Sequence, residues 1–185
     1  MRRIMCLRQK DIKSLIAYSS VAHMRLVILG LLIYSDRRIW GSFLLMVGHG
    51  LCSSGIFFMS NIIYERSHRR RIFFNKSLLR LSPSLRLLWF LFCSANISAP
   101  SSLNLVGELF LIFRIVEWSY WLIFFLIILC FLRGVYNLYL FSITRQGSFT
   151  LITNYFFLIN VREFLICLIH LIPLNILFLK MELFY

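Results

Sequence analysis

The fold of this chain is decided by one stretch, Leu88–Val116, which reads LWFLFCSANISAPSSLNLVGELFLIFRIV. Two apolar runs flank the polar segment Ser98–Ser102, and a single carboxylate, Glu108, lies inside the second run. Because proline lacks a backbone N–H and disfavours helical geometry in the residue before it, Pro100 predicts a broken helix. A carboxylate in so apolar a run is costly unless it faces protein or water. The stretch therefore predicts a charge-handling site near the middle of a membrane.

The composition of the whole chain agrees with a membrane location. Its 185 residues are 60% hydrophobic with a mean hydropathy of +0.82, which is too apolar for a soluble domain of this size. A bilayer core takes about 20 helical residues to cross, and several uncharged runs have that length. We therefore predict an all-α, polytopic transmembrane helix bundle that forms a single membrane domain over residues 1–185. Five spans are expected, at about 13–33, 40–63, 83–116 (broken near Pro100), 120–143 and 163–179.

The basic residues predict the orientation of the bundle. The formal net charge is +13, and Lys and Arg gather between the apolar runs, mostly in the N-terminal segment and in segments 64–81 and 144–160. By the positive-inside rule, these segments and the N-terminus face the cytoplasm or the mitochondrial matrix, and the C-terminus faces the opposite side. The run Arg69–Arg71 is interpreted as part of this topology signal, with anionic phospholipid such as cardiolipin as the alternative. Nucleic acid is not expected as a partner, because every basic segment adjoins lipid-length apolar sequence.

Several remaining residue types predict packing rather than chemistry. The five cysteines lie one per segment without paired spacing, so we expect apolar packing and neither a metal site nor disulfides. The glycines and serines between Gly41 and Gly55 predict close approach of the second span to other helices. The basic N-terminus is not expected to be a cleavable signal, because the apolar stretch after it has span length.

Ionisable side chains within the spans are the candidates for function. Glu108 is expected to carry protons, because intramembrane ionisable groups are functional by default, and the alternative is a structural pair with an arginine. Arg114, six residues further on, lies too far around the helix to be that arginine. His49 is either a relay group that titrates near neutral pH or a histidine hydrogen-bonded between helices.

The first span has a polar face of its own. His23 follows Tyr18, Ser19 and Ser20 within about one and a half turns. The preferred interpretation is that these hydroxyls form hydrogen bonds with His23. The alternative is that His23, Tyr18 and Ser19 support proton transfer in a relay. Lys13, at the membrane boundary, is either a relay group or a snorkelling anchor.

Three long motifs resemble a known family. They are CLRQKDIKSLIAYSSVAHM (Cys6–Met24), GHGLCSSGIFFMSNIIYER (Gly48–Arg66) and SANISAPSSLNLVGEL (Ser94–Leu109). In this order they closely resemble the C-terminal part of the mitochondrial NADH-ubiquinone oxidoreductase chain 4 family, the antiporter-like membrane subunits of respiratory complex I. LYLFSITRQG (Leu138–Gly147) and REFLICLIHLIPLNIL (Arg162–Leu177) extend the resemblance over nearly the whole chain.

The resemblance implies a proton-translocating subunit of the mitochondrial inner membrane, with its N-terminus towards the matrix and its C-terminus towards the intermembrane space. NADH oxidation, FMN, iron–sulfur clusters and ubiquinone reduction would belong to other subunits, with no cofactor, redox catalysis or metal on this chain. In the family, buried Lys, His and Glu side chains joined by water carry protons. The positions that match are Lys13, His49 and Glu108.

Other complex I membrane-arm subunits are the implied partners. The family's subunits have earlier helices with further relay groups, so either a second chain supplies them or this is a partial product. Arg25, Arg114 and Arg133 depart from the family pattern at apparent membrane depth, and Arg25 and Arg133 are either snorkelling or buried. Two other functions stay open: a structural membrane subunit without transport, and a subunit of a cation/proton antiporter.

Overall fold

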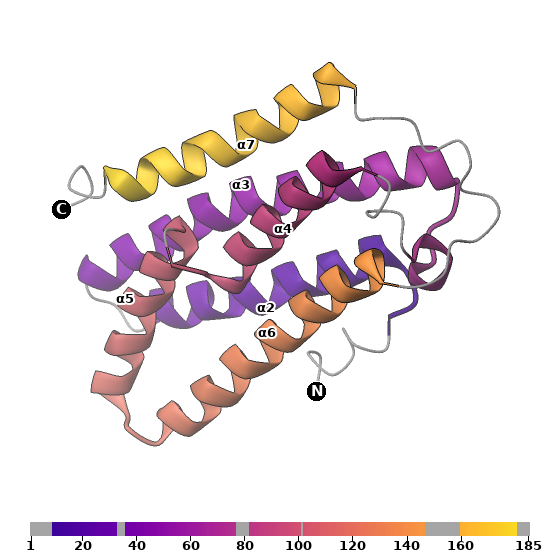
Figure 1. Cartoon of the computed structure of the whole chain (residues 1–185). Helices are drawn as coiled ribbons and strands as arrows, with labels where there is room; N and C mark the ends of the chain where they lie inside the picture. The colour runs from indigo at the N-terminus through magenta and orange to yellow at the C-terminus, as the bar shows by residue number, and fades with distance from the viewer. Residues whose placement is uncertain (1–8, 33–35, 77–81, 101, 147–159, 181–185) are drawn as a thin grey trace.

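The computed structural model describes residues 9–32, 36–76, 82–100, 102–146 and 160–180 (Figure 1). Within them the chain forms α-helices and one short 3₁₀ helix, η1. Their bounds are α2 (Ile12–Leu32), α3 (Asp36–Ser67), η1 (Ile72–Asn75), α4 (Pro83–Ile97), α5 (Leu103–Trp118), α6 (Leu122–Arg145) and α7 (Val161–Leu179).

The predicted polytopic helix bundle is confirmed. In the part of the chain described, four helices are long and apolar enough to cross a membrane: α2, α3 from residue 39, α6 and α7. The other two, α4 and α5, have 15 and 16 residues. At 1.5 Å per residue each is shorter than the roughly 30 Å hydrocarbon core. Together they form the broken span.

The break lies where proline predicts it. α4 ends because Ser98 takes a left-handed backbone conformation, with φ 66°. The N–H groups of Ser98 and Ala99 donate to carbonyls of the last turn of α4 at 3.2 and 3.0 Å, which closes the helix. Pro100 follows, and α5 begins at Leu103. The chain thus changes direction between two half-length helices instead of continuing straight (Figure 1).

The second span is longer than its sequence indicates. α3 covers 32 residues, so residues 64–67, which follow the predicted second span of about 40–63, are also helical. The amide of Asn61 donates to Glu65 Oε1 at 2.6 Å, an i,i+4 pair that stabilises this polar last turn. The short helix η1 lies within the basic segment 64–81. Cys6 and most of the basic segment 144–160 lie outside the described residues.

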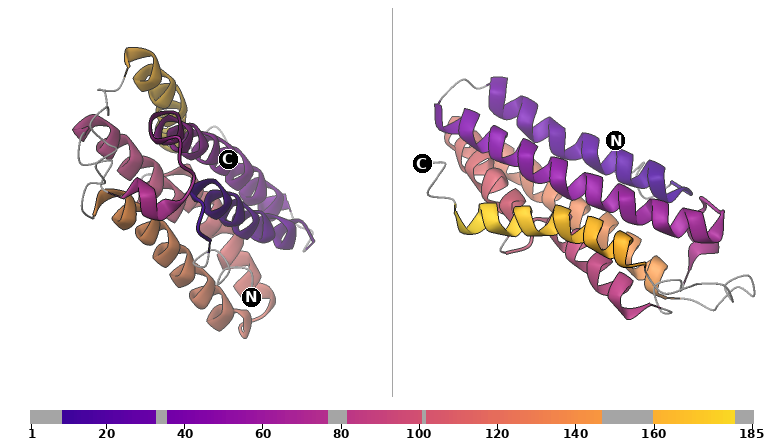
Figure 2. Two further views of the ribbon diagram at one scale, coloured as in Figure 1. Left: turned by 90° about the vertical axis from the view of Figure 1, so that its right-hand side faces the viewer. Right: turned by 90° about the horizontal axis from the view of Figure 1, so that it is seen from above.

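α3 is the central helix of the bundle. It packs against α2, α4, α5 and α7, and α6 packs against α4 and α5 on the other side (Figures 1 and 2). The closest approach joins α3 to α5: a Cβ added to Gly107 would lie 2.7 Å from the backbone nitrogen of Leu45. Gly41 and Gly48 also face α5, and Gly55 faces α4. The prediction that small residues of this span bring helices together is confirmed at these positions.

The described parts of the segments predicted to share the basic side lie at one end of the bundle. Asp11 and Arg71 form an isolated antiparallel bridge between the start of α2 and the segment after α3. Arg66, at the end of α3, forms an ion pair with Glu163 at the start of α7. η1 packs against α6, which ends at Arg145. Which side of the membrane this end faces stays a prediction.

Candidate functional site

Glu108 is the meeting point of three helices. It lies in the second turn of α5, and its side chain is 3% exposed. Its Oε1 accepts a hydrogen bond from Arg133 Nη1 on α6 and lies 3.2 Å from His23 Nδ1 on α2. Of the two environments that the sequence allowed for this carboxylate, protein or water, the structure shows protein groups. The arginine that pairs with it comes from another helix.

A fourth helix joins through a stacked pair of histidines. The rings of His23 and His49, which lies on α3, have centroids 4.6 Å apart and planes inclined by 24°. His49 is 3% exposed, and neither of its ring nitrogens has a hydrogen-bond partner in the described structure. The interhelical contact of His49 is therefore through its ring face, which leaves both nitrogens able to accept or donate a proton.

These four side chains form one buried array, which we call the Glu108 array: Arg133, Glu108, His23 and His49. His23, His49 and Arg133 each lie near the middle of a helix long enough to cross a membrane, and Glu108 meets them from the second turn of α5. Arg133 and Glu108 bring opposite charges into contact, as buried charges require. The histidines extend the array away from this pair towards α3. The geometry gives a continuous set of ionisable groups across four helices.

Asparagines connect the array to the break between α4 and α5. Asn104, one turn before the glutamate on α5, donates to the carbonyl of Ala95 in the last turn of α4 at 3.0 Å. Asn96 donates to Asn137 Oδ1 at 2.9 Å, and Asn137 donates to the backbone carbonyl of Arg133 at 3.3 Å. Carbonyls at a helix end lack partners within the helix, so side chains must satisfy them in an apolar medium. The break is thereby fixed relative to the charged pair.

Lys13 lies apart from the Glu108 array. Its Nζ donates to Asn61 Oδ1 at 2.9 Å and lies 5.1 Å from the centroid of the Tyr64 ring, at the basic end of the bundle. It precedes His23 by ten residues, which is about 15 Å along a helix. That separation exceeds any direct hydrogen bond. The structure therefore brings together Glu108, His49 and His23 but not Lys13.

The hydroxyls near His23 have partners of their own. Ser19 and Ser20 donate to the carbonyls of Ile16 and Ala17 at 2.6 and 2.7 Å, one turn back. Tyr18 is 38% exposed. His23 instead reaches Glu108 on another helix, a contact that local spacing does not reveal. Ser19 is buried one turn before the histidine, between it and Lys13.

Arg133 is the site residue whose role the sequence left undecided. The sequence did indicate that Arg133 has a partner, because an arginine in the middle of an apolar span needs one. Its partner could not be named, because Glu108 is 25 residues away on another helix. Arg114, as expected, does not need Glu108: it pairs with Glu117 at 2.6 Å on the exposed side of α5.

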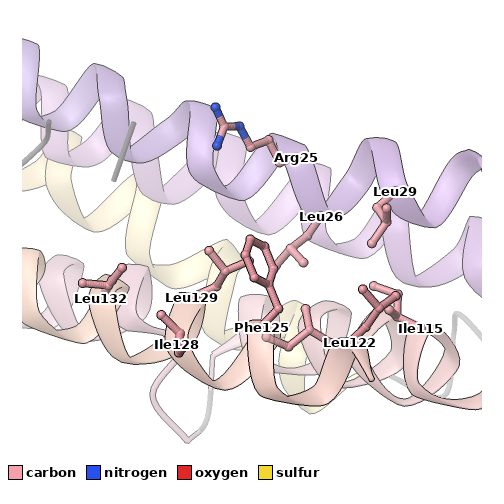
Figure 3. Close-up of a pocket in the computed structure, with 10 residues that line it drawn as sticks. Arg25, Leu26, Leu29, Ile115, Leu122, Phe125, Ile128, Leu129 and Leu132 are labelled. Atoms are coloured by element: carbon pink, nitrogen blue, oxygen red, sulfur yellow. The ribbon is translucent and has the colours of Figure 1, made fainter. Parts of the chain in front are cut away.

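Arg25, the third unusual arginine, belongs to a different feature. It is exposed and borders an apolar cleft of about 420 Å³ between α2, α5 and α6 (Figure 3). Leucine, isoleucine and phenylalanine side chains make up the rest of the lining. Its guanidinium points away from them in the view of Figure 3. The cleft has no second polar side chain with which to perform chemistry.

The cysteines act in packing where the structure describes them. Cys52, Cys93 and Cys167 belong to the main apolar cluster of the bundle, and these three and Cys130 are free thiols. Among the described residues, no group of three or more His, Cys, Asp or Glu side chains is placed to hold a metal ion.

Comparison with known proteins places this geometry in a family. Residues 1–133 match the family model described as NADH:quinone oxidoreductase/Mrp antiporter, transmembrane. The chain is 48% identical over 177 residues to NADH-ubiquinone oxidoreductase chain 4 of Anopheles arabiensis, covering 96% of this chain and 80% of that protein. It is 46% identical over 177 residues to the protein of the same name from Aedes aegypti, covering 96% of this chain and 40% of that one.

The fold has a solved counterpart. The chain superposes on a chain of respiratory complex I from Thermus thermophilus with bound NADH, with a TM-score of 0.86 and 21% sequence identity. The match covers 95% of this chain and 37% of that one. The chain thus spans about 40% of the length of the relatives from Aedes aegypti and Locusta migratoria.

Proposed function

The chain belongs to the NADH:quinone oxidoreductase/Mrp antiporter family of transmembrane proteins, and we propose that it translocates protons as a membrane subunit of NADH-ubiquinone oxidoreductase, respiratory complex I. NADH oxidation and ubiquinone reduction, with their cofactors, belong to other subunits in this proposal. The location is the mitochondrial inner membrane, with the N-terminus towards the matrix and the C-terminus towards the intermembrane space. The excess of Lys and Arg at one end of the bundle supports this orientation.

One observation carries the proposal: the Glu108 array joins buried ionisable side chains from four helices. Buried ionisable groups are expensive in a membrane, and Glu108, His23 and His49 are each at most 3% exposed. Each imidazole ring can bind and release a proton, so two stacked rings suit transfer. In so apolar a setting, a proton that arrives at one group changes the proton affinity of its neighbours strongly. Such coupling is what a relay needs.

The finer parts of the path are proposals on the same basis. Lys13 is the station at the basic end of the bundle, and Ser19, buried between Lys13 and His23, supports transfer along α2. Tyr18 is a weaker member, because it is 38% exposed. The parts of the family's proteins that this chain does not cover would supply further stations. Other membrane-arm subunits are therefore the proposed partners.

Anionic phospholipid, such as cardiolipin, is proposed as a partner at the basic end. Arg69, Arg70 and Arg71 are exposed there. The guanidinium groups of Arg69 and Arg70 lie over the rings of Phe74 and Tyr64 at 4.7 and 5.3 Å from their centroids, which leaves their charge near the surface. Clusters of this kind attract anionic lipid headgroups.

The test is proton translocation by the assembled complex with Glu108→Gln. We expect assembly and NADH oxidation to persist while the number of protons moved per NADH falls, because the array has lost its anion. Glu117→Gln is the matched control, since it removes a carboxylate on the same helix that is 56% exposed. Full proton translocation by assembled Glu108→Gln would contradict the proposal.

A second candidate is a structural subunit without transport. The observation that favours it is the ion pair between Arg133 and Glu108, which is the contact that a purely structural carboxylate would make. The same Glu108→Gln variant separates the two, because a structural subunit would lose assembly but not the protons moved per NADH in the complex that forms. A cation/proton antiporter subunit would show sodium-dependent transport without NADH-linked activity.

A further inference from the structure

We infer that Arg133 is a positioning residue that neutralises Glu108, so that the transferred proton is carried by His23 and His49 while Glu108 serves as a fixed counter-charge. The inference rests on the proposed function and assigns roles within that site. Its basis is the ion pair that Arg133 makes and the stack that the two histidines make.

The charges of the Glu108 array balance without any added proton. Arg133 carries one positive charge, Glu108 one negative charge, and both histidines can then be neutral. A buried charge needs a partner of opposite sign, and each charge of the pair already has one. Protonating Glu108 would leave the guanidinium of Arg133 alone at mid-depth. Protonating His23 instead keeps the ion pair intact and adds one positive charge 3.2 Å from the same carboxylate.

The geometry at the carboxylate separates the two roles. Arg133 and His23 approach the same oxygen, Oε1 of Glu108, from α6 and α2. The arginine is held from behind, because Asn137 donates to its backbone carbonyl and receives a bond from Asn96 on α4. One carboxylate oxygen thus has two partners, a guanidinium from α6 and an imidazole from α2. A group held in this way suits a fixed charge better than a carrier.

His49 differs from the carboxylate in its hydrogen bonding. Neither nitrogen of His49 is occupied by a hydrogen bond in the described part of the structure. Its ring stacks on His23 at 4.6 Å, so two positive charges there would repel each other strongly in an apolar medium. One proton at a time therefore enters the pair, which becomes singly positive, and leaves it neutral again. Glu108 and Arg133 keep their charges throughout.

The experiment compares single and double substitutions in the assembled complex. In Glu108→Gln, the charge of Arg133 has no counter-charge and repels a proton that approaches the histidines. In Arg133→Gln, the carboxylate of Glu108 has no counter-charge and retains the proton. Both singles should lower the protons moved per NADH. The double variant Arg133→Gln with Glu108→Gln removes both charges. We expect it to recover about half or more of the proton translocation that either single variant loses. Arg133→Lys, which keeps the charge, should stay close to the unsubstituted protein.

The outcomes separate this inference from the proposed function. If the double variant is as impaired as Glu108→Gln while Arg133→Gln translocates normally, Glu108 itself carries the proton and the inference is overturned, while the proposed function stands. If Glu108→Gln and His49→Gln both translocate normally in assembled complex, the proposed function fails with it. Should Arg133→Gln fail to assemble, Arg133→Lys and the double variant still decide, because both keep the charges balanced.

A spectroscopic measurement gives an independent answer. Infrared difference spectra of the complex during turnover distinguish a protonated carboxylic acid from a protonated imidazole. We expect an imidazole signal that disappears in His49→Gln. A carboxylic acid signal that disappears in Glu108→Gln would overturn the inference whatever the pumping results.

Discussion

The contact between α3 and α5 offers the sharpest test of how packing supports the site, through the substitution Gly107→Ala. Gly107 precedes Glu108 on α5 and faces the backbone of α3. A Cβ there would lie 2.7 Å from the backbone nitrogen of Leu45 and 3.0 Å from its Cα. Backbone atoms cannot rotate away as the end of a side chain can. The two helices must therefore separate.

The structure sets the size of this effect. Ordinary van der Waals contact begins at 3.4 Å, so the helices must part by about 0.7 Å at this point. Overpacking of a well-packed interface costs about 1–3 kcal/mol. Glu108 moves with α5, so its distance to His23, now 3.2 Å, changes as well. We expect Gly107→Ala to lower both the thermal stability of the complex and the protons moved per NADH.

Gly134→Ala is the matched control for this experiment. A Cβ at Gly134 meets no atom within 4 Å in the described structure, although the residue follows Arg133 directly. Alanine favours a helix over glycine by up to about 1 kcal/mol, so this variant should be as stable as the parent or more so. The assay is the midpoint of thermal inactivation of the purified complex, with proton translocation measured at a temperature where both variants are folded. Equal behaviour of the two variants would refute the reasoning.

Three further predictions concern the polar contacts. Asn104→Leu removes the hydrogen-bond donor of the Ala95 carbonyl at the break. This should lower the free energy of unfolding by about 1–3 kcal/mol and speed hydrogen exchange at the end of α4. Lys13→Met should lower proton translocation less than Glu108→Gln does, because Lys13 lies about 15 Å from His23 along α2. An equal loss of proton translocation would contradict this separation. Arg66→Gln should speed hydrogen exchange in α7, because it removes an ion pair with Glu163 whose side chains are only 13% and 18% exposed. Arg114→Gln is the control: the side chains of its pair are 28% and 56% exposed, so the free energy of unfolding should change by at most about 1 kcal/mol.

The comparison of sequence and structure is clearest at the helix ends. The span positions and the break near Pro100 followed from apolar run length and proline chemistry, which are local properties. The extension of α3 to Ser67 did not, because its last turn is polar and is stabilised by an i,i+4 pair that run length does not register. Arg114 was correctly separated from Glu108 by helix periodicity alone.

The sequence by itself determined that this chain crosses a membrane as helices, that one crossing is broken, and that Glu108 and His49 are buried ionisable groups. It could do so because hydropathy, proline and isolated charges act over a few residues. Only the tertiary structure decided what each charge meets: Arg133 with Glu108, and His23 with both Glu108 and His49. These partners lie 25 or more residues apart in sequence. In an apolar medium the energy of a buried charge depends on its nearest partner, so the chemistry of the site follows from helix packing.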